Sequence, residues 1–271
     1  MEGTRYMKVY EIYDEENQID IGVLLYYEKS NVYIIELRSE LDEWSAPLLF
    51  SSFVKKGIYT IPREASLAWI MERVIPIGRQ NIGSILSTHK LKEYDEMKLL
   101  ELSEGRCSQD EICIRRVEAV PKFVLERSVH NLVDCTALEN NMLLCFFADE
   151  TVKKIALSDI SDYEKTDKVI SNRNLYESCE LGCGGHYVTF NDSIDIPAWL
   201  LYEKGRIIDV KYEDFIAFTG KNIIDTSRAC EMLQCTRQNL NYLVKKHGIT
   251  PVMADVKGNL YVKNRLKAEK T

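Results

Sequence analysis

The sequence predicts an α+β protein of several domains, and three observations support this prediction. At 271 residues the chain is long enough for two or three compact units. Short apolar runs rich in β-branched and aromatic residues alternate with stretches of helical periodicity. Charge is also uneven: residues 221–271 hold ten Lys or Arg against four Asp or Glu, a balance of +6, whereas the remaining 25 basic and 38 acidic residues give residues 1–220 a balance of −13. A basic segment behind an acidic body is typical of a protein in which one module meets phosphate.

Composition indicates a folded protein without a membrane segment. Hydrophobic residues make up 45% and charged residues 28% of the chain, which are ordinary values. The longest apolar runs fall far short of the roughly 20 residues that a membrane helix needs. The N-terminus is acidic and lacks the apolar stretch of a signal peptide, so we expect a cytoplasmic protein. The eight cysteines are scattered along the chain, so in a cytoplasmic protein we expect free, mostly buried thiols and no disulfides.

Residues 1–132 are expected to form a mixed α/β N-terminal domain. Residues 19–27 and 31–37 are strand-like and are separated by a three-residue turn, which predicts a hairpin. Helices are expected over residues 44–54, 66–74 and 94–102, with a helical face also around residues 82–86 and a short extended piece over residues 57–62.

Residues 72–114 carry a motif pattern that resembles a known family. It consists of R-V-I-P-x-x-R from Arg73 to Arg79, the pair Ile85-Leu86, and G-R-x-S-x-D from Gly105 to Asp110. This pattern is similar to the N-terminal accessory region of HipA-like bacterial kinases. No glycine-rich nucleotide loop, catalytic H-x-D or acidic metal motif follows, so the resemblance implies toxin–antitoxin-like or phage-related regulation without kinase activity.

Residues 136–206 are expected to form a small α+β middle domain. Two hairpins are predicted, one over residues 142–147 and 151–157, the other over residues 184–190 and 193–196 around the turn at Asn191 and Asp192. The pattern over residues 139–206 resembles a small uncharacterised bacterial domain found beside helix-turn-helix modules. Residues 207–222 are expected to connect this domain to the C-terminal one, with a helix over residues 206–218 and a hinge over residues 219–222.

Residues 223–271 are predicted to form a winged helix-turn-helix. Asp225 and Thr226 offer a cap for a first helix, and Thr236 offers a cap for a second helix after a break at residues 234–235. Gly248 is expected to end the second helix in the left-handed region. Residues 250–254 and 259–262 are strand-like and flank a turn, which predicts the wing. The inward side of the first helix is expected to hold Ala229, Met232 and Leu233, and that of the second Leu240, Leu243 and Val244.

This C-terminal pattern also resembles a known group. The run T-S-x-A-x-x-x-L-x-C-T-R-Q-x-L-x-x-L-V-K, followed by a hairpin with Gly258 and Tyr261, is similar to the winged helix domains of excisionases and MerR-type proteins. The resemblance covers about a fifth of the chain and implies binding to double-stranded DNA.

Within a helix-turn-helix, the start of the second helix enters the major groove. Arg237 is suited to guanine, and Gln238 and Asn241 are suited to adenine. Phosphate contacts are expected from Thr236, Tyr242, Lys245 and Lys246, with the wing tip reaching the adjacent backbone or minor groove. The predicted DNA-binding residues are Thr236, Arg237, Gln238, Asn239, Asn241, Tyr242, Lys245, Lys246, Lys257 and Asn259.

Other polar clusters are candidates for metal binding or catalysis. Cys179, Cys183 and His186 have a spacing that resembles a metal site, but a structural zinc site requires a fourth ligand. The neighbouring glycines are explained by the backbone conformation of a turn. No cysteine lies in a nucleophile motif, and acidic pairs such as Asp149-Glu150 read as solvated turn residues. We therefore expect no metal, no cofactor and no enzymatic activity.

The sequence thus favours a sequence-specific DNA-binding protein that regulates transcription or a mobile element. Residues 1–220 would bind an effector or a protein partner, or form a homodimer. The alternative is a protein-interaction module, antitoxin-like or phage-encoded, whose acidic body acts on a nucleic-acid-associated partner. A small helical domain for protein contact would give the same C-terminal pattern.

Overall fold

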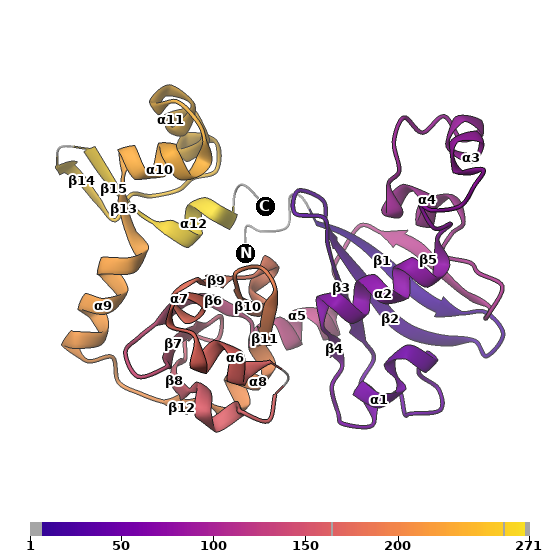
Figure 1. Ribbon diagram of the computed structural model, residues 1–271, viewed down its shortest axis with the longest axis horizontal. Helices are drawn as coiled ribbons and strands as arrows, with labels where there is room; N and C mark the ends of the chain where they lie inside the picture. Colours follow the sequence, from indigo (N-terminus) through magenta and orange to yellow (C-terminus); the bar gives the residue numbers. More distant parts are fainter. Residues whose placement is uncertain (1–6, 164, 257, 269–271) are drawn as a thin grey trace. The chain divides into compact units, whose positions relative to one another are not determined.

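The chain is a mixed α+β protein with several antiparallel sheets, as the sequence predicts (Figure 1). The computed structural model describes residues 7–163, 165–256 and 258–268. Contacts divide the chain into an N-terminal unit, Thr4–Val124, and a C-terminal unit that holds Leu125–Thr271. The segments expected as a middle and a C-terminal domain both fall in the C-terminal unit.

The N-terminal unit is built on a five-stranded antiparallel sheet in the order β4-β3-β2-β1-β5. The predicted hairpin is confirmed, with Tyr27 opposite Val32 at its end. Gly22 has φ +148°, and a Cβ there would lie 2.1 Å from the Glu36 carbonyl oxygen, so the close strand approach requires glycine. The strands are β1 (Met7–Asp14), β2 (Ile19–Tyr27), β3 (Val32–Leu37), β4 (Thr60–Ile61) and β5 (Ile112–Val117).

Helix α2 (Arg63–Arg73) crosses one face of this sheet and closes its core (Figure 1). Trp69 and Ile70 on α2 are buried against the sheet. The Ser66 hydroxyl accepts a hydrogen bond from the Ile35 amide at 3.1 Å and donates to the Ile61 carbonyl at 3.2 Å, which fixes α2 to β3 and β4. The other helices of this unit are η2 (Leu48–Phe50, 3₁₀), α1 (Ser51–Val54), α3 (Ile82–Thr88) and α4 (Glu96–Leu102).

The helix expected over residues 44–54 is wrong for its first half. The Asp42 carboxylate accepts hydrogen bonds from the amides of Trp44 and Ser45, which holds a turn in place of a helix. Pro47 follows with an extended backbone, and helical structure begins only at Leu48. Local side-chain hydrogen bonds therefore replace the helix that the apolar pattern favours.

The C-terminal unit contains a four-stranded sheet in the order β12-β8-β7-β6 and a three-stranded sheet in the order β11-β10-β9. Both predicted hairpins are confirmed, and Asn191 and Asp192 take the positive φ values that a tight turn demands. The first strand of the second hairpin begins at Tyr187 and not at Gly184, because Cys183–Gly185 form a 3₁₀ helix. One buried core lies between the two sheets. The strands are β6 (Leu132–Ala137), β7 (Met142–Phe147), β8 (Val152–Ala156), β9 (Cys179–Leu181), β10 (Tyr187–Phe190), β11 (Ile194–Pro197) and β12 (Arg206–Ile207).

Short helices cover this core and lead from one strand to the next. The helix α8 runs through the apolar stretch after the second hairpin, and its buried Leu200 and Leu201 belong to the core between the sheets. These elements are η3 (Leu157–Ile160), α6 (Thr166–Ser171), α7 (Arg173–Glu177), η4 (Cys183–Gly185) and α8 (Ala198–Lys204), while α5 (Lys122–Ser128) spans the boundary between the two units.

The connector differs from its expected form. The helix predicted over residues 206–218 begins later, as α9 (Tyr212–Asn222), and the expected hinge at residues 219–222 is its last turn. Residues 206–207 instead pair with β8 as strand β12. Contacts from α9 to the sheet set these bounds, because Asp214 pairs with Lys154 and the Asn222 amide donates to the Thr136 hydroxyl.

Candidate nucleic-acid interface

Two short helices joined by a tight turn form the centre of the candidate site. Helix α10 (Thr226–Leu233) is capped by Asp225, whose carboxylate accepts from the Arg228 amide at 2.8 Å. Helix α11 (Arg237–Lys246) is capped by Thr236, whose hydroxyl accepts from the Asn239 amide at 3.2 Å. Between the helices, Gln234 has φ 48°. The structure therefore contains the two capped helices that the sequence predicts.

The two helices pack on a small three-stranded sheet in the order β13-β15-β14. Its strands are β13 (Ile223–Asp225), β14 (Met253–Val256) and β15 (Gly258–Val262), and helix α12 (Lys263–Ala268) follows. Leu240 and Ala229 are fully buried in this core together with Tyr261, and Met232, Leu233 and Val244 pack against it. Gly248 ends α11 with φ 66°, as expected.

Polar and basic side chains form one exposed stripe along α11. Counted from Gln238, the residues Asn241, Tyr242 and Lys245 lie three, four and seven positions further along the helix, which places all four on one face. All four are exposed, and Thr236, Arg237, Asn239 and Lys246 are exposed as well. We call these eight residues the α11 face. The structure thus brings together eight of the ten residues predicted to bind DNA.

Two members of the α11 face have contacts within the domain. The Arg237 guanidinium donates to the Ser227 hydroxyl at 3.3 Å, which links the start of α11 to α10. The Lys246 ammonium lies 5.7 Å from the centroid of the Tyr242 ring, one helical turn away. Both contacts are solvent-exposed, so a ligand can displace them at low free-energy cost.

The hairpin holds the remaining two predicted residues. Lys257 lies outside the described residues. Asn259 is half-buried, and its amide donates to the Tyr261 hydroxyl at 3.1 Å. Its backbone is also held by Thr226, whose hydroxyl accepts from the Asn259 amide at 3.1 Å. Thr226 therefore joins β15 to α10 and does not act as the helix cap.

The first hairpin strand begins later than predicted. Residues 250–254 were expected to be extended, but β14 begins at Met253 and continues to Val256. Pro251 lacks a backbone N–H and so cannot donate to a ladder, and pairing with β15 starts after it. Pairing with β15 extends to Val256, which lies opposite Gly258.

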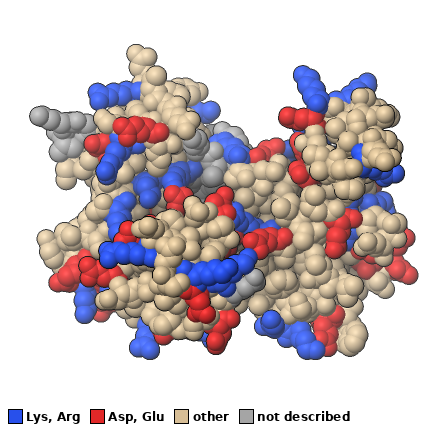
Figure 2. All heavy atoms as spheres, in the orientation of Figure 1, with Lys and Arg blue, Asp and Glu red and all other residues tan. Residues whose placement is uncertain are grey.

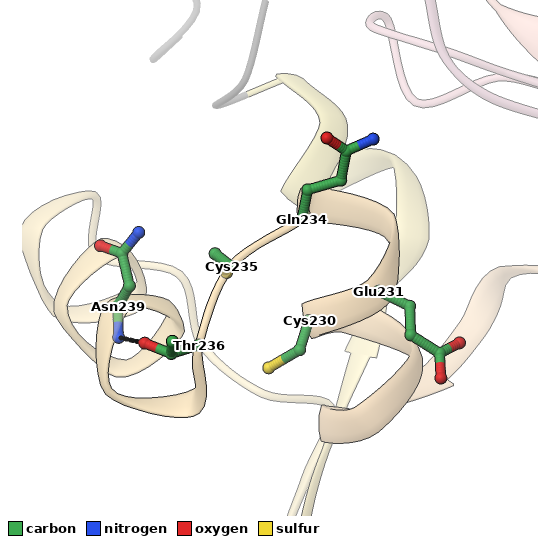
Figure 3. A pocket seen from close by; sticks show the side chains of 6 residues that line it. All are labelled: Cys230, Glu231, Gln234, Cys235, Thr236 and Asn239. Atoms are coloured by element: carbon green, nitrogen blue, oxygen red, sulfur yellow. Dashed lines mark hydrogen bonds between the residues drawn. The ribbon is translucent and has the colours of Figure 1, made fainter.

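A shallow, open hollow lies where α10 ends and α11 begins (Figure 3). Glu231, which the sequence did not point to because it lies on the first helix, is among the lining residues, but its carboxylate points away from α11 (Figure 3). The lining residues are Cys230, Glu231, Gln234, Cys235, Thr236 and Asn239.

The surface charge shows no large area of a single sign on the face seen in Figure 2, where acidic and basic side chains are interspersed. The α11 face itself has three basic residues and no acidic one. Its positive character is therefore local.

Helix α12 anchors the C-terminal segment to the larger sheet of the same unit. The Asn264 amide donates to the Asp134 carboxylate on β6 at 2.7 Å, and both side chains are buried. Burial raises the pKa of Asp134, against the effect of the hydrogen bond from Asn264. An exposed ion pair between Lys267 and Glu180, at 2.8 Å, adds to the junction.

The Asp134 contact supports a stability prediction. Replacing Asp134 with Val leaves the buried amides of Asn264 and Cys135 without their acceptor, and should lower the free energy of unfolding by about 1–3 kcal/mol. Asp134→Asn keeps an acceptor and should be far milder. A raised pKa in the fold means that wild-type stability falls as pH rises through that pKa, and Asp134→Asn should remove this fall. Urea titrations at pH 4 to 7 measure both effects; equal losses for the two variants would contradict the prediction.

The cysteine and histidine residues considered for metal binding do not converge. Among the residues that the structure describes, no three His, Cys, Asp or Glu side chains form a metal-binding group. Hydrogen bonding to Cys135 and burial raise the pKa of the Cys179 thiol, which disfavours the thiolate that a metal needs. Gly184 and Gly185 have φ values of 59° and 69°, so this turn requires glycine. Burial lowers the pKa of His186 to about 4.

The two halves of the motif over residues 72–114 meet in the structure. The Arg73 guanidinium donates to both carboxylate oxygens of Asp110, at 2.9 and 2.6 Å. It also stacks on the Trp69 ring at 4.1 Å. Only 4% of the Arg73 side chain is exposed, which makes this pair a structural element of the N-terminal unit.

No family model matches the chain, and no curated protein or solved structure matches it either. The family resemblances of the sequence motifs therefore rest on the residues that carry them. Within the described residues, no helix has the length and apolar character needed to cross a membrane.

Proposed function

We propose that the chain is a sequence-specific DNA-binding protein and that residues 223–271 are a winged helix-turn-helix domain. The observation that carries this proposal is the exposed stripe of Gln238, Asn241, Tyr242 and Lys245 on a helix whose other side is buried. Amides paired with aromatic and basic side chains on one helix face suit a groove lined by base edges and phosphates.

In this proposal α11 is the recognition helix. Arg237 and Gln238 lie in its first turn, the part of a recognition helix that meets base edges, and Asn241 lies one turn further on. Thr236, Tyr242, Lys245 and Lys246 contact phosphates and fix the register. Asn239 lies beside the hollow and would contact the same groove. The role is one of binding and includes no catalytic step.

The acidic front of the chain gives the proposed protein its regulatory part. Residues 1–220 have a balance of −13, which disfavours their own contact with DNA. We infer that they bind a protein partner or an effector, and that the chain acts in transcription or mobile-element regulation.

A second function is favoured by a different observation. Trp44, in a turn, and Leu48, at the start of η2, are 87% and 92% exposed, and large exposed apolar side chains suit a protein contact. In this alternative the chain is an interaction module that acts on a nucleic-acid-associated partner.

Selection of bound sequences from random double-stranded DNA by the full-length chain tests the proposal. Enrichment of one short motif is the expected result. Retention without enrichment, or no retention at 50 mM salt, would favour the interaction module.

Two substitutions on α11 should distinguish base recognition from phosphate contact. Arg237→Ala should weaken binding to the selected motif by about 1–3 kcal/mol and relax the preference at one base position. Lys245→Gln should weaken binding to all sequences alike and lower the slope of log affinity against log salt by about one. Fluorescence anisotropy over a salt series measures both effects.

Lys168→Gln is the matched control, because Lys168 is exposed and belongs to the same unit but lies outside the α11 face. The assignment fails if Lys168→Gln and Lys245→Gln change the salt slope equally.

A further inference from the structure

An apolar patch runs along α9 and the segment before it. Its side chains are large and exposed: Tyr212 by 74%, Ile207 by 71%, Phe215 by 55%, Ile216 by 48% and Val210 by 44%. Tyr212, Phe215 and Ile216 have the spacing of one helix face. We call these five residues the α9 patch. Adjacent exposed side chains of this size mark an interaction site more often than single exposed residues do.

Helix α9 cannot turn this patch inward, because its opposite side is fixed to the sheet. Asp214 forms an ion pair with Lys154 on β8. The Phe218 ring meets the Phe146 ring of β7 edge-on, at 5.1 Å between centroids. At the end of the helix, the Asn222 amide donates to the Thr136 hydroxyl on β6. The patch is therefore held outward in one orientation.

The charges around the patch indicate what covers it. Over residues 203–213, the segment that carries most of the patch, three cations and three anions are exposed, so this segment has no excess of either sign. A nucleic acid would favour a positively charged segment, and a strongly charged protein would favour a segment whose charge is opposite to its own. In a contact between two copies related by two-fold symmetry, each copy offers both cations and anions, so cations of one can face anions of the other. These residues are Lys204, Arg206, Lys211, Glu203, Asp209 and Glu213.

The size of the patch fits the centre of a dimer interface. At their observed exposures, Tyr212 and Phe215 together present roughly 250 Å² of side-chain surface. A stable interface buries about 800 Å² on each partner, with an apolar centre and a polar rim. The five apolar side chains and the six charged ones of the same segment have this composition.

We propose that the α9 patch joins two copies of this chain in a two-fold symmetric contact. The dimer does not depend on the proposed function. If that function holds, the dimer also supplies two recognition helices, since one helix-turn-helix reads only a short half-site.

Sedimentation velocity of the full-length chain, over a concentration series in the absence of DNA, tests this inference. The expected result is a reversible dimer. Phe215→Glu should raise the dimer dissociation constant at least about thirtyfold, as loss of a central aromatic residue does. Leu67→Glu is the matched control, because Leu67 is 41% exposed on α2 and should leave the dissociation constant unchanged.

A wild-type chain that stays monomeric throughout, or a dimer that Phe215→Glu does not weaken, overturns the inference. If Phe215→Glu fails to fold by circular dichroism, Tyr212→Ser replaces it, because Tyr212 is the most exposed member of the patch. A dimer that selects no DNA sequence would refute the proposed function and leave this inference standing.

Discussion

Asp110→Asn should lower the free energy of unfolding of the N-terminal unit by about 3–5 kcal/mol. The substitution leaves the guanidinium of Arg73, whose side chain is 4% exposed, without its opposite charge. Arg73→Met should cost less, because the Asp110 side chain is 33% exposed and can turn to water. The order of these two losses follows from burial alone, since each variant breaks the same pair.

The fluorescence of Trp69 measures this effect, because its ring lies 4.1 Å from the Arg73 guanidinium. The chain has three tryptophans, so Trp44→Phe with Trp199→Phe leaves Trp69 as the single emitter. In this background, Glu111→Gln is the control, because it removes an exposed carboxylate beside Asp110. A loss below about 1 kcal/mol for Asp110→Asn would place the pair among ordinary surface ion pairs.

His186 should make the C-terminal unit sensitive to acid. Burial lowers its pKa from 6.5 to about 4, so the neutral ring stabilises the fold above pH 6.5. As pH falls below 6.5 the unfolded chain takes up a proton that the folded chain resists. This stability is lost progressively down to about pH 4, and amounts to roughly 3 kcal/mol. His186→Gln has no titrating ring and should lose about 3 kcal/mol less than wild type over the same range.

Urea unfolding followed through the amide NMR signals of β10 measures this loss at pH 4, 5, 6 and 7. His89→Gln is the control, since His89 is exposed. Because protonation of Asp134 acts in the opposite direction, the comparison is between wild type and variant at each pH. Parallel pH profiles for wild type and His186→Gln would contradict the assignment.

Local signals predicted the hairpins of this fold well. The turn at Asn191 and Asp192 needs two positive φ values, and these residue types adopt them at low cost. Strand content, turn position and register then follow from a few adjacent residues. The α+β class and the antiparallel pairing were predictable for the same reason.

The connector was predicted poorly because distant contacts set its bounds. Helix α9 begins two residues before Asp214, which pairs with Lys154 sixty residues earlier. It continues to Asn222, which donates to Thr136 eighty-six residues away. The partners of these residues lie outside residues 206–222, so no pattern within that segment can reveal them. The expected hinge was therefore placed on the last turn of the helix, which Asn222 fixes to β6.

The α11 face was predictable, and the hairpin side chains were not. Helical periodicity separates buried Leu240 from exposed Asn241 without any tertiary information. The contact of Thr226 with Asn259 joins residues thirty-three positions apart, and so requires the sheet pairing to be known. The DNA-binding role of both regions stays a prediction.

The anchors of α9 and α12 fix the C-terminal segment at both its ends. Lys221 and Asn222 hold its entrance to β6, and Asn264 holds its exit to Asp134 on the same strand. A segment tethered at one end samples a range of positions, whereas one tethered at two ends has little rotational freedom. If two copies pair symmetrically and bind DNA as proposed, these two anchors would allow only one separation between the half-sites. Inserting or removing one base pair between them would then reduce affinity, in contrast to the tolerance that flexibly linked readers show.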